Sequence, residues 1–95
     1  MAAYVIVQAE VTDWDRFSEY LKESPGVIAR YGGKYIARGG ETIMLEGGNE
    51  ARRIVLIVFP SMQKVKEWYH SEEYRKVKLL RQGAATGSLI AIDGC

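Results

Sequence analysis

The chain has 95 residues, of which 47% are hydrophobic and 26% are charged, and its formal net charge is +1. A chain of this length forms one domain, residues 1–95, because it cannot build a second hydrophobic core. The small net charge gives no reason to expect a nucleic acid or a membrane as a partner. The single cysteine, Cys95, cannot form an internal disulfide, which favours a location in the cytoplasm. The chain has only one histidine and one cysteine, so no metal site is expected.

The first predicted elements are a strand and a long helix. Residues 3–11 (AYVIVQAEV) are rich in Val and Ile, as strands are. Thr12 or Asp13 can cap the following helix, whose apolar residues recur at helical spacing. Proline lacks an amide proton, so Ser24-Pro25 predicts a kink or a restart with Ser24 as a new cap. Gly32-Gly33 is then expected to end the helix.

The middle of the chain predicts two more strands. Residues 34–48 (KYIARGGETIMLEGG) alternate like a strand but contain Gly39-Gly40. A two-residue hairpin at the glycines is one interpretation, and a bulge or bend within one long edge strand is the other. We favour the bend, because residues 46–51 (EGGNEA) make the better turn. Residues 52–59 (RRIVLIVF) predict the third strand.

The last third of the chain predicts a helix in two pieces and a fourth strand. Ser61 can cap the first piece, and the segment 68–71 (WYHS) forms the joint. Ser71 is followed by two glutamates, which is typical of a helix N-terminus, where acids favour the positive end of the dipole. Residues 88–93 (SLIAID) predict the final strand.

The resulting order, β-α-β-β-α-β, favours an α+β, ferredoxin-like fold, with a four-stranded antiparallel sheet and two helices on one face. The apolar strands 4–9 and 54–59 should be central. A sheet covered on one face should alternate apolar and polar residues, but these strands hardly alternate. A second copy of the chain, packed on the open face, is the simplest cover, so we expect a homodimer.

Five segments together resemble one known family. They are YGGKYIARGG, LEGG, RRIVLIVFPSM, WYHSEEY and LRQGAA. Through these segments the chain resembles the bacterial family called domain of unknown function 1330, which lies within the dimeric α/β-barrel superfamily. The resemblance covers essentially the whole chain. The resemblance implies the fold and the dimer but assigns no reaction. The wider superfamily includes cofactor-independent monooxygenases, haem-degrading enzymes, muconolactone isomerases and stress-responsive binding proteins.

The haem-degrading branch can be compared residue by residue. Its W-x-x-S helix joint is matched by Trp68 and Ser71. Its iron-binding histidine would fall near Lys78, and charged lysine does not bind haem iron; its strand asparagine would fall near Gln8. Haem degradation is therefore disfavoured, and no cofactor is expected.

In this architecture a ligand cavity lies between the helices and the sheet. The candidate site residues are Arg38, Trp68, His70, Ser71, Tyr74 and Arg81. Two arginines beside aromatic rings suit a small anionic or aromatic molecule. Alternatively, Arg38 and Arg81 are salt links to Glu41, Glu46 or Glu72, Ser71 is only a cap, and His70 is a solvated joint residue.

Two functions follow. The first is a cofactor-independent enzyme, monooxygenase- or isomerase-like, in which His70 or a tyrosine is the acid–base group and an arginine binds the oxyanion. The second is a non-catalytic dimeric binding or stress-response protein that uses the same cavity.

Overall fold

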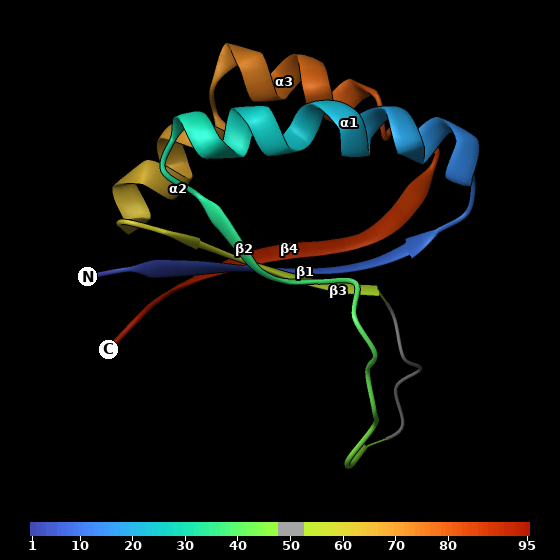
Figure 1. The fold of residues 1–95 in the computed structure, drawn as a ribbon, viewed down its shortest axis with the longest axis horizontal. Helices are drawn as coiled ribbons and strands as arrows, with labels where there is room; N and C mark the ends of the chain where they lie inside the picture. The colour runs from blue at the N-terminus through green and yellow to red at the C-terminus, as the bar shows by residue number, and fades with distance from the viewer. Residues whose placement is uncertain (48–52) are drawn as a thin grey trace.

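The computed structural model describes residues 1–47 and 53–95. In chain order its elements are β1 (Ala3–Val11), α1 (Trp14–Arg30), β2 (Lys34–Arg38), β3 (Arg53–Phe59), α2 (Met62–Tyr69), α3 (Glu72–Leu79) and β4 (Ala85–Asp93). The strands form one antiparallel sheet in the order β2-β3-β1-β4, and all three helices lie on one face of it (Figure 1). The predicted ferredoxin-like fold, with β1 and β3 central, is confirmed. The described helices include none that is long and apolar enough to cross a membrane.

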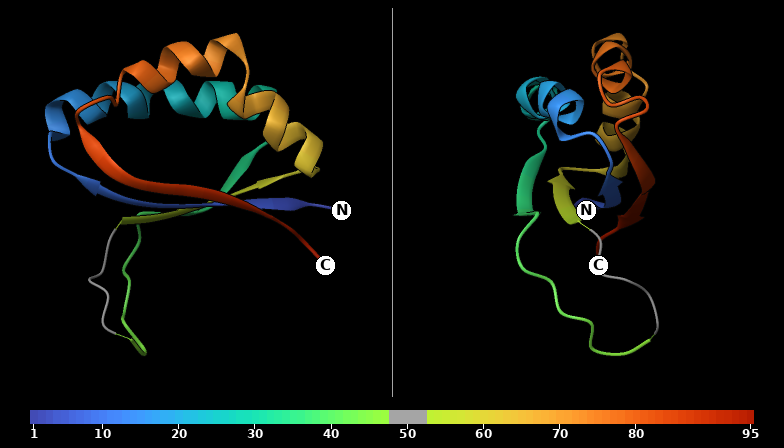
Figure 2. Two further views of the ribbon diagram at one scale, coloured as in Figure 1. Left: turned by 180° about the vertical axis from the view of Figure 1, so that it is seen from behind. Right: turned by 90° about the vertical axis from the view of Figure 1, so that its right-hand side faces the viewer.

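The core lies between the helices and the odd-numbered residues of the central strands. Val5 pairs with Ile57 and Ala3 with Phe59, and all four are buried. The register places the even-numbered residues on the opposite face of the sheet. That face is also apolar, with the cross-strand pairs Ile6–Leu56 and Tyr4–Val58 in the centre and Ile90 and Ile92 on β4. None of the described helices covers it (Figure 2).

The ends of α1 follow from local residue types. Asp13, one of the two predicted caps, accepts a hydrogen bond from the Arg16 amide at 3.1 Å. At the other end Gly32 has φ +82°, which favours glycine, and the amides of Gly32 and Gly33 bond back to the carbonyls of Ala29 and Ile28. These two bonds form a Schellman motif, so the predicted glycine stop is confirmed.

The predicted restart at Ser24-Pro25 is wrong. α1 continues through Pro25 as one helix, although proline in a helix interior costs about 3 kcal/mol. Residues on both sides of the proline pack in one hydrophobic core, Tyr20 before it and Val27 and Ile28 after it, and this packing keeps the helix continuous. Ser24 is not a cap: it is 1% exposed, and its hydroxyl lies near that of Tyr35 without forming a hydrogen bond of good geometry.

The long edge strand with a bend at Gly39-Gly40 is also wrong. β2 ends at Arg38, and its irregularity is a bulge between Tyr35 and Ala37. Beyond it, residues 39–47 are not a strand, and they extend from the sheet on the side opposite the helices (Figure 1). The glycine pair has no side chain with which to continue a sheet edge. Most of the predicted turn at 46–51, and Arg52 of the predicted third strand, fall outside the described residues.

The second helix is in two pieces, as predicted. α2 begins after Ser61, whose hydroxyl accepts a hydrogen bond from the Lys64 amide at 3.2 Å. α3 begins after Ser71 and lies beside α1 above the sheet (Figure 2). The fourth strand is longer than the predicted 88–93, because β4 starts at Ala85 and pairs with β1 along its whole length.

Candidate functional site in the helix–sheet space

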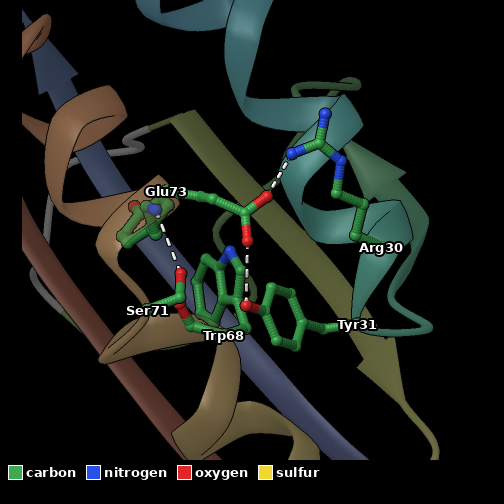
Figure 3. A network of polar contacts seen from close by, with 6 residues as sticks. Arg30, Tyr31, Trp68, Ser71 and Glu73 are labelled. Carbon is green, nitrogen blue, oxygen red and sulfur yellow. Dashed lines mark hydrogen bonds and ion pairs between the residues drawn. The ribbon is translucent and has the colours of Figure 1, made fainter.

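Ser71 holds the joint between α2 and α3. Its hydroxyl oxygen accepts a hydrogen bond from the Tyr74 amide at 3.0 Å and donates one to the Trp68 carbonyl at 2.8 Å (Figure 3). The first bond satisfies an amide that the helix start leaves free, and the second ties that start to the end of α2. Ser71 is thus a structural cap, and its side chain lines none of the three cavities described below.

Glu73 fixes the start of α3 to the end of α1. One carboxylate oxygen pairs with the Arg30 guanidinium, and the other accepts a hydrogen bond from the Tyr31 hydroxyl at 3.1 Å (Figure 3). Arg30 first and Tyr31 second lower the pKa of the Glu73 carboxyl, because both favour its charged form. This network links the end of α1 to the start of α3 on the surface of the molecule.

His70, the predicted acid–base group, lies outside that space. It is the exposed C-cap residue of α2, and its ring meets the Tyr69 ring edge-on at 5.4 Å between centroids. It lines none of the three cavities. This position supports the interpretation of His70 as a solvent-exposed residue at the joint between the helices.

Three neighbouring cavities lie between the helices and the sheet. The largest, here called the outer cleft, measures about 470 Å³ and is open between α2 and β4. The α1–β4 pocket measures about 60 Å³ and the α1–β2 pocket about 40 Å³. Leu89 lines all three, Trp68 lines the outer cleft and the α1–β2 pocket, and Arg81 lines the outer cleft and the α1–β4 pocket. Shared walls make these cavities parts of one site.

The charges that line this site are all positive. In the described chain the charged lining residues are Arg38, Arg53 and Arg81, with no aspartate or glutamate among them. The expected salt links do not form there: Glu72 pairs with Arg75 of its own helix, and neither Arg38 nor Arg81 makes an ion pair with a described residue. An unpaired cation in an apolar cavity favours an anionic ligand.

Arg81 lies beside two tyrosines, Tyr20 and Tyr74. Its guanidinium carbon lies 5.5 Å from the centre of the Tyr20 ring, and its Nε is buried without a hydrogen-bond partner among the described residues. Burial alone would lower the pKa of Arg81, but the nearby hydroxyls of Tyr74 and Tyr20 raise it by more. Arg81 therefore stays charged where it borders the outer cleft and the α1–β4 pocket.

Tyr74 and Trp68 pack together beneath the joint. Their rings lie 4.5 Å apart between centroids, and the two residues are 0% and 1% exposed. The Tyr74 hydroxyl lies 2.7 Å from that of Tyr20, and burial together with this neighbour raises its pKa, with Arg81 opposing the shift. The Trp68 indole nitrogen is buried and has no hydrogen-bond partner among the described residues.

A one-residue bulge turns Arg38 toward the site. Because of the bulge, Arg38 pairs with Val55, whose side chain is on the helix side of the sheet. Regular pairing from Tyr35 onward would have set Arg38 opposite Ile54, on the open face. The Arg38 guanidinium carbon instead lies 4.3 Å from the centre of the Tyr35 ring and lines the α1–β2 pocket with Arg53. Bulges commonly re-aim a side chain in this way.

The structure thus brings together Trp68, Tyr74 and Arg81, sets Arg38 at a second opening, and leaves Ser71 and His70 outside. Sequence analysis missed Tyr20 and Arg53 as lining residues. A signal for Tyr20 existed, because it lies beside the apolar stripe of α1 and carries a polar tip. It also missed Gly87, whose φ of +154° and closeness to the Gln8 carbonyl leave no space for a Cβ. In the described residues no cluster of His, Cys, Asp or Glu could hold a metal ion.

Solved structures with similar folds belong to the ferredoxin-like class. A protein of unknown function from Rhodopseudomonas palustris aligns with a TM-score of 0.81 at 22% identity, over 99% of this chain and 82% of that one. A cofactor-independent oxygenase from Streptomyces nogalater aligns with a TM-score of 0.70 at 9% identity, over 99% and 93% of the two chains. A dimeric protein of unknown function with a ferredoxin-like fold, from Bacteroides fragilis, gives 0.66 at 11% identity, over 98% and 96%.

The sequence itself identifies the family. The family model for the domain of unknown function DUF1330 matches residues 2–95, and the chain belongs to that family. The search of curated proteins found no match. The resemblance noted in the five sequence segments is therefore confirmed, and the fold is shared with a wider group of small ferredoxin-like proteins.

Proposed function

We propose that this protein is a homodimeric small-molecule-binding protein that takes a small anionic or aromatic molecule in the helix–sheet space. One observation carries the proposal: an open cleft of about 470 Å³ is bordered by Arg81, which makes no ion pair with a described residue, and by no described carboxylate. Apolar and aromatic walls with few polar groups are what small-molecule sites usually offer. The single cysteine also supports a cytoplasmic location.

The homodimer in this proposal rests on the open face of the sheet. Leaving this face in water forgoes roughly 1.5–3 kcal/mol for each large side chain that could be buried. Ile90 and Ile92 are 63% and 57% exposed in the single chain, and the centre of the face carries Ile6 and Leu56. The Bacteroides fragilis neighbour is described as a dimer, which supports a homodimer here.

A cofactor-independent enzyme of the oxygenase or isomerase kind is the first candidate for the activity. The similarity in fold to the Streptomyces nogalater oxygenase supports it. In such an enzyme Tyr20, Tyr35 or Tyr69, which line the cavities, would be the acid–base group, and Arg81 would stabilise negative charge on the substrate.

A non-catalytic binding protein is the second candidate, and the position of His70 favours it. With His70 outside, the described lining residues include no group that ordinarily titrates near neutral pH. Oxygen uptake, and the mass of the products formed from hydroxylated aromatic compounds without added metal, separate the two candidates. Turnover would establish the enzyme, and binding without turnover would establish the binding protein.

The binding proposal is tested with benzoate and its neutral analogue benzamide, followed by tryptophan fluorescence because Trp68 lines the cleft. We expect benzoate to bind more tightly than benzamide. Arg81→Ala should weaken benzoate binding by about 10- to 100-fold, since a charge-assisted hydrogen bond contributes roughly 1.5–3 kcal/mol. Arg75→Ala is the matched control, because Arg75 is exposed and already paired with Glu72.

His70→Ala should leave benzoate affinity unchanged, and it should alter turnover only if the protein is an enzyme. Equal benzoate affinity in wild type and Arg81→Ala would reject the site.

A further inference from the structure

A pair of tyrosine hydroxyls joins α1 to α3 inside the proposed site. The oxygens of Tyr20 and Tyr74 are 2.7 Å apart, so one hydroxyl donates to the other. Tyr20 is half-buried and its ring lines both small pockets, whereas Tyr74 is 0% exposed. Tyr20 can therefore contact a molecule in the pockets, whereas Tyr74 is enclosed by protein.

The direction of this hydrogen bond follows from counting protons. The Tyr74 hydroxyl has no acceptor among the described residues other than Tyr20, and the nearby Arg81 can only donate. If Tyr20 donated, the proton of Tyr74 would be buried without an acceptor, which proteins strongly avoid. Tyr74 is thus the donor. Its proton occupies one lone pair of Tyr20 and leaves the proton of Tyr20 free to donate to another group.

Arg81 supplies a second donor at the same place. It lines the α1–β4 pocket together with Tyr20 and also borders the outer cleft, so it lies where the two spaces meet. The walls of the outer cleft include Val65, Trp68 and Leu89, which suit an apolar ring.

Building on the proposed function, we propose that the Tyr20 hydroxyl and the Arg81 guanidinium together bind one anionic oxygen of an aromatic ligand, a phenolate or an enolate. The ring of the ligand lies in the outer cleft, and Tyr74 acts as a positioning residue that orients and polarises the Tyr20 hydroxyl. A cation and a hydroxyl donor suit a single charged oxygen on an apolar ring.

The chemistry of this pair has a measurable consequence. Both groups favour the ionised form of a bound phenol, so binding lowers its pKa. Of the charged side chains facing the site, Arg38 and Arg53 would shift that pKa in the same direction as Arg81, and no described lining residue carries a negative charge. Burial keeps Tyr74 protonated at neutral pH, because its pKa is raised, and it remains a donor.

The test uses 4-nitrophenol, whose ionised form is yellow and which ionises near neutral pH, with nitrobenzene as the neutral analogue. We expect the phenolate to bind more tightly than nitrobenzene and the bound phenol to titrate at lower pH than the free one. Tyr20→Phe should weaken phenolate binding about tenfold, with little effect on nitrobenzene, and raise the pKa of the bound phenol. Tyr74→Phe should weaken binding less, because Tyr20 keeps its own proton, and raise that pKa by a smaller amount. Tyr31→Phe is the control, since its hydroxyl bonds to Glu73 away from the site.

The outcomes separate this inference from the proposed function. If neither probe binds and benzoate does not bind either, the cleft is not a small-molecule site and both proposals are rejected. If benzoate binds but neither of these probes does, only the oxyanion pair is rejected. If nitrobenzene binds and the phenolate binds no better, or if the pKa of bound 4-nitrophenol equals that in water, only the oxyanion pair is rejected. The pKa of the probe bound to wild type decides this even if a variant does not fold.

Discussion

Ser71 has a structural role and is not part of the lining of the ligand site. Its hydroxyl satisfies the Tyr74 amide and bonds to the Trp68 carbonyl, and it faces none of the three cavities. Trp68 lines the outer cleft and the α1–β2 pocket, and Tyr74 packs against Trp68. A change at Ser71 should therefore act on folding before it acts on binding.

Ser71→Ala should lower the free energy of unfolding by about 1 kcal/mol, as the loss of a helix N-cap does. Urea titration followed by circular dichroism measures it. Ser18→Ala is the control, because the Ser18 hydroxyl is bonded only to the Asp15 carbonyl within α1 and is exposed, so a smaller change is expected. Weaker binding of benzoate at an unchanged melting temperature would instead give Ser71 a direct role in the site.

The helix caps were predictable from the sequence. Asp13, Ser61 and Ser71 cap the helices that follow them, because a cap needs only a short polar side chain before an amphipathic run. Tyr20 was not predictable as a site residue. Its role depends on Tyr74, 54 positions further along the chain, and only the packing of α1 against α3 brings the two hydroxyls together.

Glu73 forms one of the links between α1 and α3. Its pKa is lowered by Arg30 and then by Tyr31, both at the end of α1. A carboxyl whose pKa is lower in the folded chain than in the unfolded chain stabilises the fold above its unfolded pKa. That stabilisation is lost as the pH falls through the lowered, folded pKa.

Glu73→Gln should therefore lower stability at neutral pH and weaken its dependence on pH below the ordinary carboxyl pKa of 4.5. Thermal unfolding between neutral and acidic pH measures both effects. Arg30→Gln should have little further effect in the Glu73→Gln background, because the pair is then already broken. Additive effects of the two substitutions at neutral pH would show that the cross-helix pair contributes no stability.

Element order was predictable, whereas two local irregularities were not. The sequence signals at Ser24-Pro25 and Gly39-Gly40 were read as breaks within elements. α1 instead continues through its proline because residues on both sides of it pack in one hydrophobic core, and β2 stops before its glycines. The bulge before Ala37 has no local marker in the sequence, yet it decides which face of the sheet receives Arg38.

The described helices cover one face of the sheet and leave the other open (Figure 2). The unbroken apolar run of β3 predicted this, because its even-numbered residues are as apolar as its odd-numbered ones. The identity of the ligand was not predictable from the fold, since many functions share this fold. It depends on a few donors, such as those of Arg81 and Tyr20.

The apolar open face of the sheet predicts a homodimer. Leu56 lies at the centre of the open face, paired with Ile6, and a lysine there would have to bury its charge if two such faces packed together. We expect wild type to sediment as a dimer at micromolar concentration, and Leu56→Lys to yield monomer or unfolded chain. Leu79→Lys is the matched control, because Leu79 is 52% exposed on α3, on the helical side, and the dimer should persist. A stable, folded wild-type monomer at micromolar concentration would reject the dimer. The open face would then have to tolerate water, while the ligand site, which lies on the other side of the sheet, would remain testable by itself.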